Sequence, residues 1–145
     1  MLPWNKARPN VVTSEPGNAV VEFVGIMAVI IVPALVLISA LGTLAAAQFA
    51  LNAAARDAVR EAVRAPDETA IYQHAQETAE EVWSNREFTE PLITAVSCQG
   101  APCLTPGADI TITVSATVPI PLIDRHYTLS ASQTMKVDAF RAGSP

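Results

Sequence analysis

The sequence has few of the residues that carry out chemistry. Only two cysteines and two histidines occur among its 145 residues. Cys98 and Cys103 are too few for a disulfide-dense scaffold, and no further ligands accompany them to complete a zinc site. A Gly-x-Ser-x-Gly elbow, a phosphate-binding glycine loop and a His-Glu-x-x-His motif are all absent. We therefore expect no enzymatic activity, no bound metal and no cofactor.

Positive charge is also scarce. Nine Lys and Arg stand against fourteen Asp and Glu, which gives a formal net charge of -5. The basic residues form no block and do not alternate with aromatic residues. Binding to nucleic acid requires several cationic side chains on one face to neutralise phosphates, so we expect no nucleic-acid partner.

Charge of either sign is missing from one long stretch. An apolar block runs from Ala19 to about Leu51, and Glu22 is its only charged residue. A bilayer is spanned by about 20 apolar residues, whereas the apolar region of a cleaved signal peptide has roughly 7–15. The block therefore predicts a retained transmembrane helix. Its backbone must be helical in lipid, and Pro33 should kink it.

The sequence predicts two helices. The first is the anchor itself, which should continue beyond the apolar block through an alanine-rich segment and end at Pro66. The second should run from about Asp67 to Asn85. Its apolar face is expected to contain Ile71, Tyr72, Ala75, Ala79, Val82 and Trp83, opposite a face with Gln76, Glu77, Glu80 and Glu81.

The last third of the chain changes to the period of a strand. Apolar and polar residues alternate over 110–118 and again over 127–137, where Gln133 is the one break. Residues 92–97 form a weaker strand candidate. These patterns predict an α+β fold with about three antiparallel strands packed on the helices. The proline-punctuated segment 119–123 could fill the core or form an exposed contact patch, and the pattern favours core filling.

Two further features each have two interpretations. Arg56, Arg60 and Arg64 recur every four residues and so form one stripe on the anchor helix. The stripe could reach lipid phosphates and pair locally with acidic neighbours, or it could contact another subunit. Cys98 and Cys103 could close a small loop outside the cytoplasm, where disulfides persist, or remain free thiols.

A short motif stands where the apolar block begins. Gly17 and Asn18 precede Ala-Val-Val, and Glu22 and Phe23 follow. A carboxylate in a membrane helix costs at least about 2.5 kcal/mol at the helix centre and less near its end, so it persists where it has a partner. An acidic residue near a helix N-terminus is also favoured by the helix dipole, which is an alternative explanation.

The motif resembles the type IV prepilin processing site, at which a prepilin peptidase cuts after the glycine. The resemblance implies a cut between Gly17 and Asn18, which makes Glu22 the fifth residue of the mature chain. In that family, the glutamate pairs with the new N-terminal amine of a neighbouring subunit and so sets the register of assembly. Phe23 follows the glutamate in this motif.

A longer stretch is similar to one particular family. Residues 48–60 resemble the segment after the anchor in TadE-like proteins of the Flp (tight adherence) pilus system, although an extra alanine precedes Arg56. The order of later features is also similar: a cysteine loop, a Thr-rich strand, a Pro-apolar-Pro turn and a final strand. The resemblance covers about residues 14–140. It implies a minor pilin or pseudopilin whose partners are a prepilin peptidase, other pilin subunits and the Tad assembly machinery.

These interpretations combine into one expected organisation. Residues 1–17 form a leader, residues 18–48 a transmembrane helix, and residues 49–145 an exported α+β domain. The N-terminus should be cytoplasmic and the C-terminal domain extracytoplasmic, although basic residues flank both ends of the helix and do not decide the orientation. The alternative is a single-pass anchored binding module with no role in a pilus.

Overall fold

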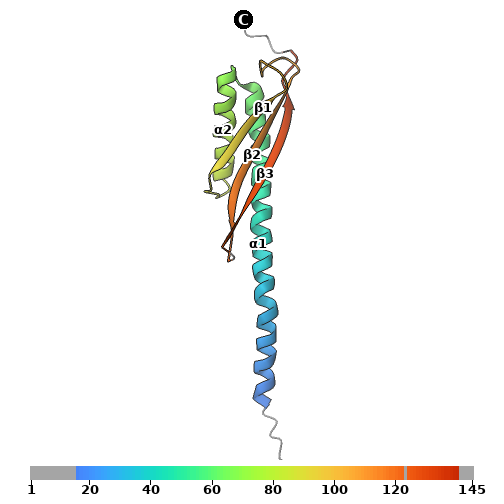
Figure 1. Cartoon of the computed structure of the whole chain (residues 1–145), viewed down its shortest axis with the longest axis vertical. Coiled ribbons are helices and arrows are strands. Elements are labelled where there is room, and N and C mark those ends of the chain that lie inside the picture. Colours follow the sequence, from blue (N-terminus) through green and yellow to red (C-terminus); the bar gives the residue numbers. More distant parts are fainter. Residues whose placement is uncertain (1–15, 123, 141–145) are drawn as a thin grey trace, which may run out of the picture. The chain divides into compact units, whose positions relative to one another are not determined.

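The computed structural model describes residues 16–122 and 124–140, with the backbone alone described for residues 16–18. Two helices are followed by three strands, which confirms the predicted α+β fold (Figure 1). The elements are α1 (Pro16–Arg64), α2 (Glu68–Ser84), β1 (Leu92–Cys98), β2 (Asp109–Ile120) and β3 (Arg125–Lys136). Most of the expected leader, residues 1–15, lies outside the described residues.

The chain divides into two compact units between Leu35 and Val36, a point that lies inside α1. In the first unit the described side chains are exposed and almost all apolar; Val29, for example, is 74% exposed. The helix continues through Pro33. A helix satisfies the backbone hydrogen bonds of an apolar, transmembrane-type segment within the segment itself. The kink expected at Pro33 and the domain boundaries expected at residues 17 and 48 stay predictions.

The second unit contains an antiparallel sheet in the order β1-β2-β3. The central strand β2 pairs with β1 from Ile110 to Ala116 and with β3 along its whole length. The inward residues of β2 are at most 2% exposed, and they are Ile110, Ile112, Val114, Ala116 and Val118. The alternation in the sequence therefore identified the buried face of this strand correctly.

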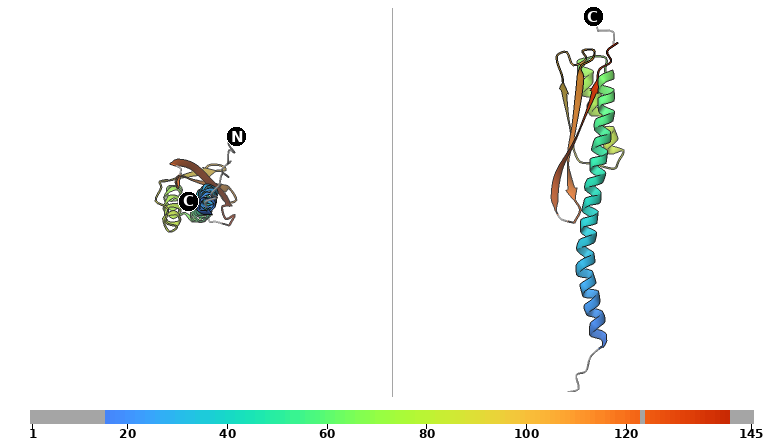
Figure 2. Two further views of the ribbon diagram at one scale, coloured as in Figure 1. Left: turned by 90° about the horizontal axis from the view of Figure 1, so that it is seen from below. Right: turned by 90° about the vertical axis from the view of Figure 1, so that its right-hand side faces the viewer.

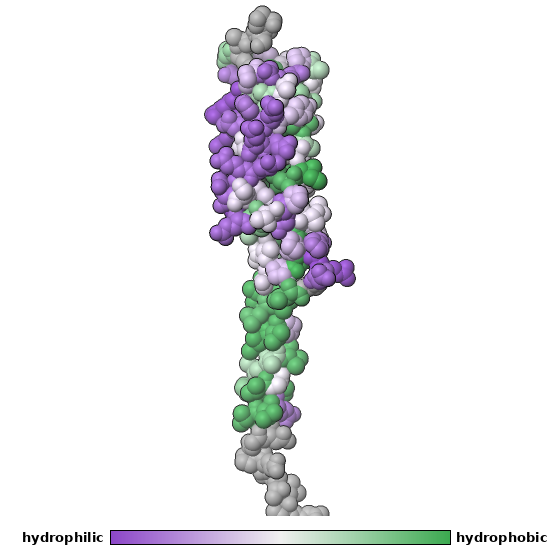
Figure 3. All heavy atoms as spheres, turned by 90° about the vertical axis from the view of Figure 1, so that its left-hand side faces the viewer, coloured by the Kyte–Doolittle hydropathy of each residue, from purple (hydrophilic) through white to green (hydrophobic). Residues whose placement is uncertain are grey.

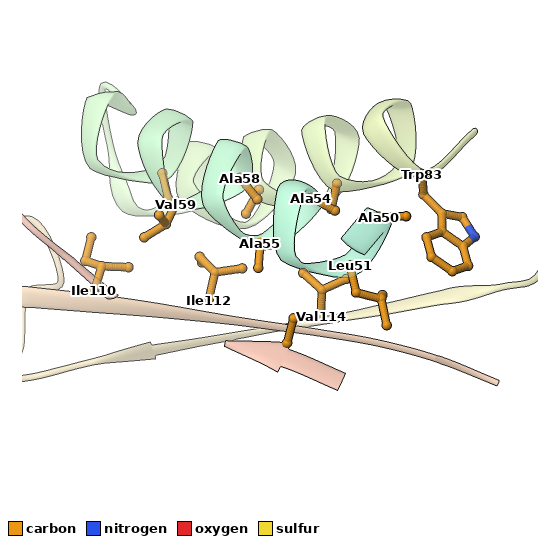
Figure 4. Packing of buried hydrophobic residues seen from close by; sticks show 14 of the residues in the cluster. Ala50, Leu51, Ala54, Ala55, Ala58, Val59, Trp83, Ile110, Ile112 and Val114 are labelled. Atoms are coloured by element: carbon orange, nitrogen blue, oxygen red, sulfur yellow. The ribbon is translucent and has the colours of Figure 1, made fainter. Parts of the chain in front are cut away.

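Both helices of this unit pack on one face of the sheet, and the core lies between these two layers (Figures 2 and 4). The buried face of α1 is built mostly from alanine. These small side chains pack against the branched side chains of β2, which fill most of the space between the helix and the sheet. The fully buried α1 residues are Ala47, Ala50, Leu51, Ala54, Ala55, Ala58, Ala62 and Val59, the last at 2% exposure.

The second helix is fixed at both ends. Asp67 caps it, because its Oδ1 accepts a hydrogen bond from the Ala70 backbone N–H at 2.8 Å. At the other end, Trp83 stacks on Phe88 with ring centroids 4.3 Å apart. The Trp83 Nε1–H also donates to the Glu90 carbonyl at 3.0 Å. These contacts turn the chain back from α2 into β1.

One residue of the expected α2 face is misplaced. The buried residues are Ala70, Ile71, Ala75, Ala79 and Trp83. The prediction that Tyr72 is buried is wrong, since its side chain is 54% exposed. Tyr72 lies about 60° round the helix from Ala75 and so falls at the margin of the buried face.

The segment 119–123 does not fill the core, and that prediction is also wrong. Leu122 is 79% exposed, while Ile120 and Pro121 are half-buried. Ile123 lies outside the described residues. The reason is the register: β1 begins only at Leu92, opposite Ala116, whereas β2 and β3 stay paired out to Ile120 and Arg125. The turn therefore closes a two-stranded ribbon that extends past the core.

Candidate assembly surfaces

The predicted processing motif lies at the beginning of α1. This helix starts at Pro16, so the backbone of Gly17 and Asn18 is helical. Glu22 is exposed, and Phe23 beside it is 62% exposed. In the part of the chain that the structure describes, no cation pairs with the Glu22 carboxylate. This carboxylate thus stands alone on an apolar helix surface.

The helix dipole accounts poorly for this glutamate in the uncut chain. Favourable interaction with the dipole fades beyond the first turn of a helix. The first turn of α1 contains no acidic residue, and Glu22 lies six residues after Pro16. A cut after Gly17 would bring Glu22 close to a new N-terminus with a full positive charge.

The three arginines are exposed, and Arg56 and Arg64 engage in local pairs. Arg64 Nη1 lies 3.5 Å from Glu61 Oε1, and Arg56 Nε lies 4.0 Å from Asp57 Oδ1. The side chains of Arg56 and Arg64 are 61% and 73% exposed. Exposed ion pairs contribute about 0–1 kcal/mol, so these pairs stabilise the fold little. The local pairing expected from the sequence is present, and the arginines remain available to another partner.

The stripe does not form a single site. Arg60 and Arg64 line an open groove of about 450 Å³ whose other lining residues are Asp57, Glu61, Val63, Thr78 and Met135. Arg56 lines a separate groove of about 580 Å³, together with Phe49, Asn52, Ala53, Arg86 and Gln133. The sequence spacing placed the three arginines on one side of α1 but could not show that they face different grooves.

The second groove contains residues that sequence reasoning did not select. Arg86 follows α2 and is brought near Arg56 only by the fold. Phe49 is 70% exposed although it lies in the helix that forms the core. Aromatic and arginine side chains that line the same groove are typical of protein contact surfaces. The one signal in the sequence that could have indicated Phe49 is its position as a large aromatic residue in an alanine-rich stretch of the helix.

The cysteine loop is closed. Cys98 and Cys103 form a disulfide, and Cys98 is the last residue of β1. The same loop is tied to α2, because the Cys103 backbone N–H donates to Glu68 Oε1 at 2.6 Å. The Gln99 N–H donates to the Asp109 carbonyl at 2.9 Å. The disulfide thus fastens the end of the sheet to the beginning of the second helix.

The surface of α1 matches a membrane span in length and apolarity. Within the described residues it is the one helix with these properties, and its most apolar part is almost wholly exposed. Figure 3 shows the surface of this part of the helix as predominantly hydrophobic. A core helix of similar composition would be covered by other elements. No group of three His, Cys, Asp or Glu side chains in the described part could hold a metal ion.

Comparisons with protein-family models, with curated proteins and with solved structures found no match for this chain.

Proposed function

We propose that this chain is a membrane-anchored, minor pilin-like structural subunit of the TadE-like type, which acts in assembly of a Flp-type pilus after a prepilin peptidase removes its leader. The observation that carries the proposal is the exposed Glu22 carboxylate on an apolar helix, five residues after Gly17 and without a partner in the described chain. The amine created by the cut supplies a partner, either from a neighbouring copy or from a different pilin-like subunit.

Two other features support an exported subunit. The disulfide between Cys98 and Cys103 is typical of an oxidising compartment, and so it supports an arrangement with the folded unit outside the cytoplasm and the N-terminus inside. The alanine-lined face of α1 against a small sheet leaves the opposite side of that helix free for other subunits. Phe49, Arg56 and Arg86 line a groove suited to a protein contact.

The alternative is an anchored binding module outside the cytoplasm with no pilus role. It shares the anchor and the disulfide, and it requires neither a cut after Gly17 nor a function for Glu22. The two proposals therefore differ at the N-terminus.

The proposal is tested by the intact mass and N-terminal sequence of the protein recovered from its native membranes. We expect the chain to begin at Asn18. Replacing Gly17→Leu should abolish the cut. The matched control is Gly25→Leu in the same helix, where no atom lies within 4 Å of an added Cβ, and it should be cut normally.

Other N-termini have distinct meanings. A chain that begins at Met1 or Leu2 contradicts the pilin-like proposal and favours the binding module. A chain that begins well after Phe23 shows that the apolar block is a cleaved signal sequence, and both proposals then fail.

A further inference from the structure

The end of the β2–β3 ribbon exposes one large aliphatic side chain, Leu122, among polar and aromatic ones. Beyond Ala116 the ribbon has no third strand, because Leu92, the first residue of β1, pairs with Ala116. Leu122 in the turn is 79% exposed, and Tyr127 on β3 is 55% exposed. Arg125 and His126 next to them are exposed as well. Leu122 therefore stands beside an aromatic and a cationic side chain at a free end of the sheet, which raises the question of what this end contacts.

A hydrogen bond fixes the level of this tip along α1. Gln48 Nε2 donates to the Ser130 carbonyl of β3 at 3.1 Å. Arg125 lies five residues before Ser130, which is about 16 Å along a strand and corresponds to about eleven residues of a helix. Since α1 and β3 run in the same direction, the turn lies beside roughly residue 37 of α1 (Figure 1).

The burial of α1 agrees with this placement. Ala40 is only 6% exposed, whereas Leu37, Ile38 and Leu41 around it are about 60% exposed. Figures 1 and 2 show the ribbon end beside this part of the helix in two perpendicular views. The ribbon therefore covers one side of α1 here and leaves its other sides apolar and open.

The same level is where the helix should leave the membrane. A bilayer core is crossed by about 20 residues, and 20 residues counted from Phe23, which directly follows the charged Glu22, end at Gly42, inside the range 18–48 expected for the transmembrane helix. The ribbon tip and the outer edge of the hydrocarbon layer thus coincide along α1. We propose that the tip of the β2–β3 ribbon rests in the outer interface of the bilayer, with Leu122 among the acyl chains, as a second membrane contact besides the anchor helix.

The chemistry of the tip fits a lipid surface. Tyrosine is enriched at the boundary between headgroups and acyl chains, and arginine there can reach phosphates. Leu122 has a φ of 69°, a conformation that is unusual for a bulky residue and exposes its side chain. Asp124 offsets the charge of Arg125, so the contact should not depend on anionic lipids.

The inference rests on one part of the proposed function, namely that α1 spans the bilayer. It requires neither the cut after Gly17 nor a role for Glu22. It can therefore fail while the pilin-like proposal stands, and it can hold if the chain is an anchored binding module.

The test uses the full chain in phosphatidylcholine vesicles, with the native disulfide left oxidised. A single environment-sensitive dye is attached at Leu122→Cys, at Val29→Cys in the apolar helix, or at Gln73→Cys on the exposed side of α2. We expect lipids with a nitroxide near the headgroup to quench the dye at position 122 at least twofold. Lipids with a nitroxide deep in the acyl chains should quench position 29, and neither lipid should quench position 73.

A second measurement tests whether the membrane contact is caused by the attached dye or by Leu122 itself. The dye is moved to His126→Cys, and Leu122 is either kept or replaced by aspartate. Leu122 packs against little in the folded unit, so Leu122→Asp should leave the fold intact. We expect the quenching at position 126 to fall at least twofold in the Leu122→Asp variant.

The outcomes are distinguishable. Quenching at position 29 without quenching at position 122 overturns this inference and leaves the anchor in place. An unquenched position 29 shows that α1 is outside the bilayer, and then the inference and the proposed function both fail. Quenching at position 122 that disappears when the protein is diluted in lipid indicates contact with a second copy, which also overturns the inference.

Discussion

At the scale of single residues, the close contact between α1 and β2 depends on alanines. Ala54, Ala55 and Ala58 are fully buried, and Ala55 lies opposite the branched side chains of β2 (Figure 4). At position 55 a methyl group fills the space between the helix and the sheet. A larger side chain would have to push the helix away or adopt a strained rotamer.

We therefore expect Ala55→Leu to lower the free energy of unfolding by about 1–3 kcal/mol, the usual cost of overpacking a dense core. The control is Ala46→Leu, an exposed position on the same helix that should change stability little. The measurement is denaturation of the full chain in detergent, followed by the fluorescence of the buried Trp83. Equal stability of the two variants would contradict the close packing of α1 on the sheet.

A second residue is expected to be suboptimal for stability. The Thr94 hydroxyl on β1 is buried and has no hydrogen-bond partner. Burial of an unpaired hydroxyl is unfavourable, and valine has nearly the same shape. Thr94→Val should raise the free energy of unfolding by about 1 kcal/mol, measured in the same denaturation experiment. Thr111→Val removes a hydroxyl that is 2.7 Å from Thr134 Oγ1, so it should give no such gain.

At the scale of elements, the small disulfide loop joins β1 to α2. In the chain-entropy account, closing a loop of this size stabilises a fold by about 2 kcal/mol through the unfolded state. We expect the double substitution Cys98→Ser and Cys103→Ser to lower the free energy of unfolding by that amount. The hydrogen bond from the backbone N–H of residue 103 to the Glu68 carboxylate does not require the disulfide, and it should keep the loop in place.

The measurement compares denaturation with and without a reducing agent. Reduction should destabilise the natural chain and leave the double variant unchanged. An effect of the reductant on both proteins would show that it acts elsewhere than on this disulfide.

The elements were predictable where local pattern and packing agree. The alternation of residues 110–118 identified β2, and Pro66-Asp67 marked the beginning of α2. Both signals were readable because strand periodicity and helix capping depend on residues that are close together in the sequence. The exposure of Leu122 was not predictable, since it depends on β1 being shorter than its partner. The groove with Phe49 and Arg86 depends on residues 37 positions apart, and no local pattern encodes that proximity.

At the scale of the whole molecule, one carboxylate distinguishes an assembling subunit from a merely anchored one. Glu22 lies in an apolar helix, and in lipid an unpaired charge is costly. If the amine of a cut neighbouring chain stabilises it, then the glutamate and the cut contribute to the same ion pair. Removing either partner should then have the same consequence.

We accordingly expect Glu22→Gln to be inserted and cut normally but to lose its place in larger assemblies, measured by sedimentation of native membranes dissolved in mild detergent. The control Glu77→Gln makes the same change on the exposed side of α2 and should assemble normally. Gly17→Leu, which cannot be cut, should show the same loss as Glu22→Gln. The double variant should lose no more than either single one, because substitutions that remove one shared interaction are not additive. Losses that add would show that the glutamate and the new N-terminus act separately, and the proposed pairing would then be wrong.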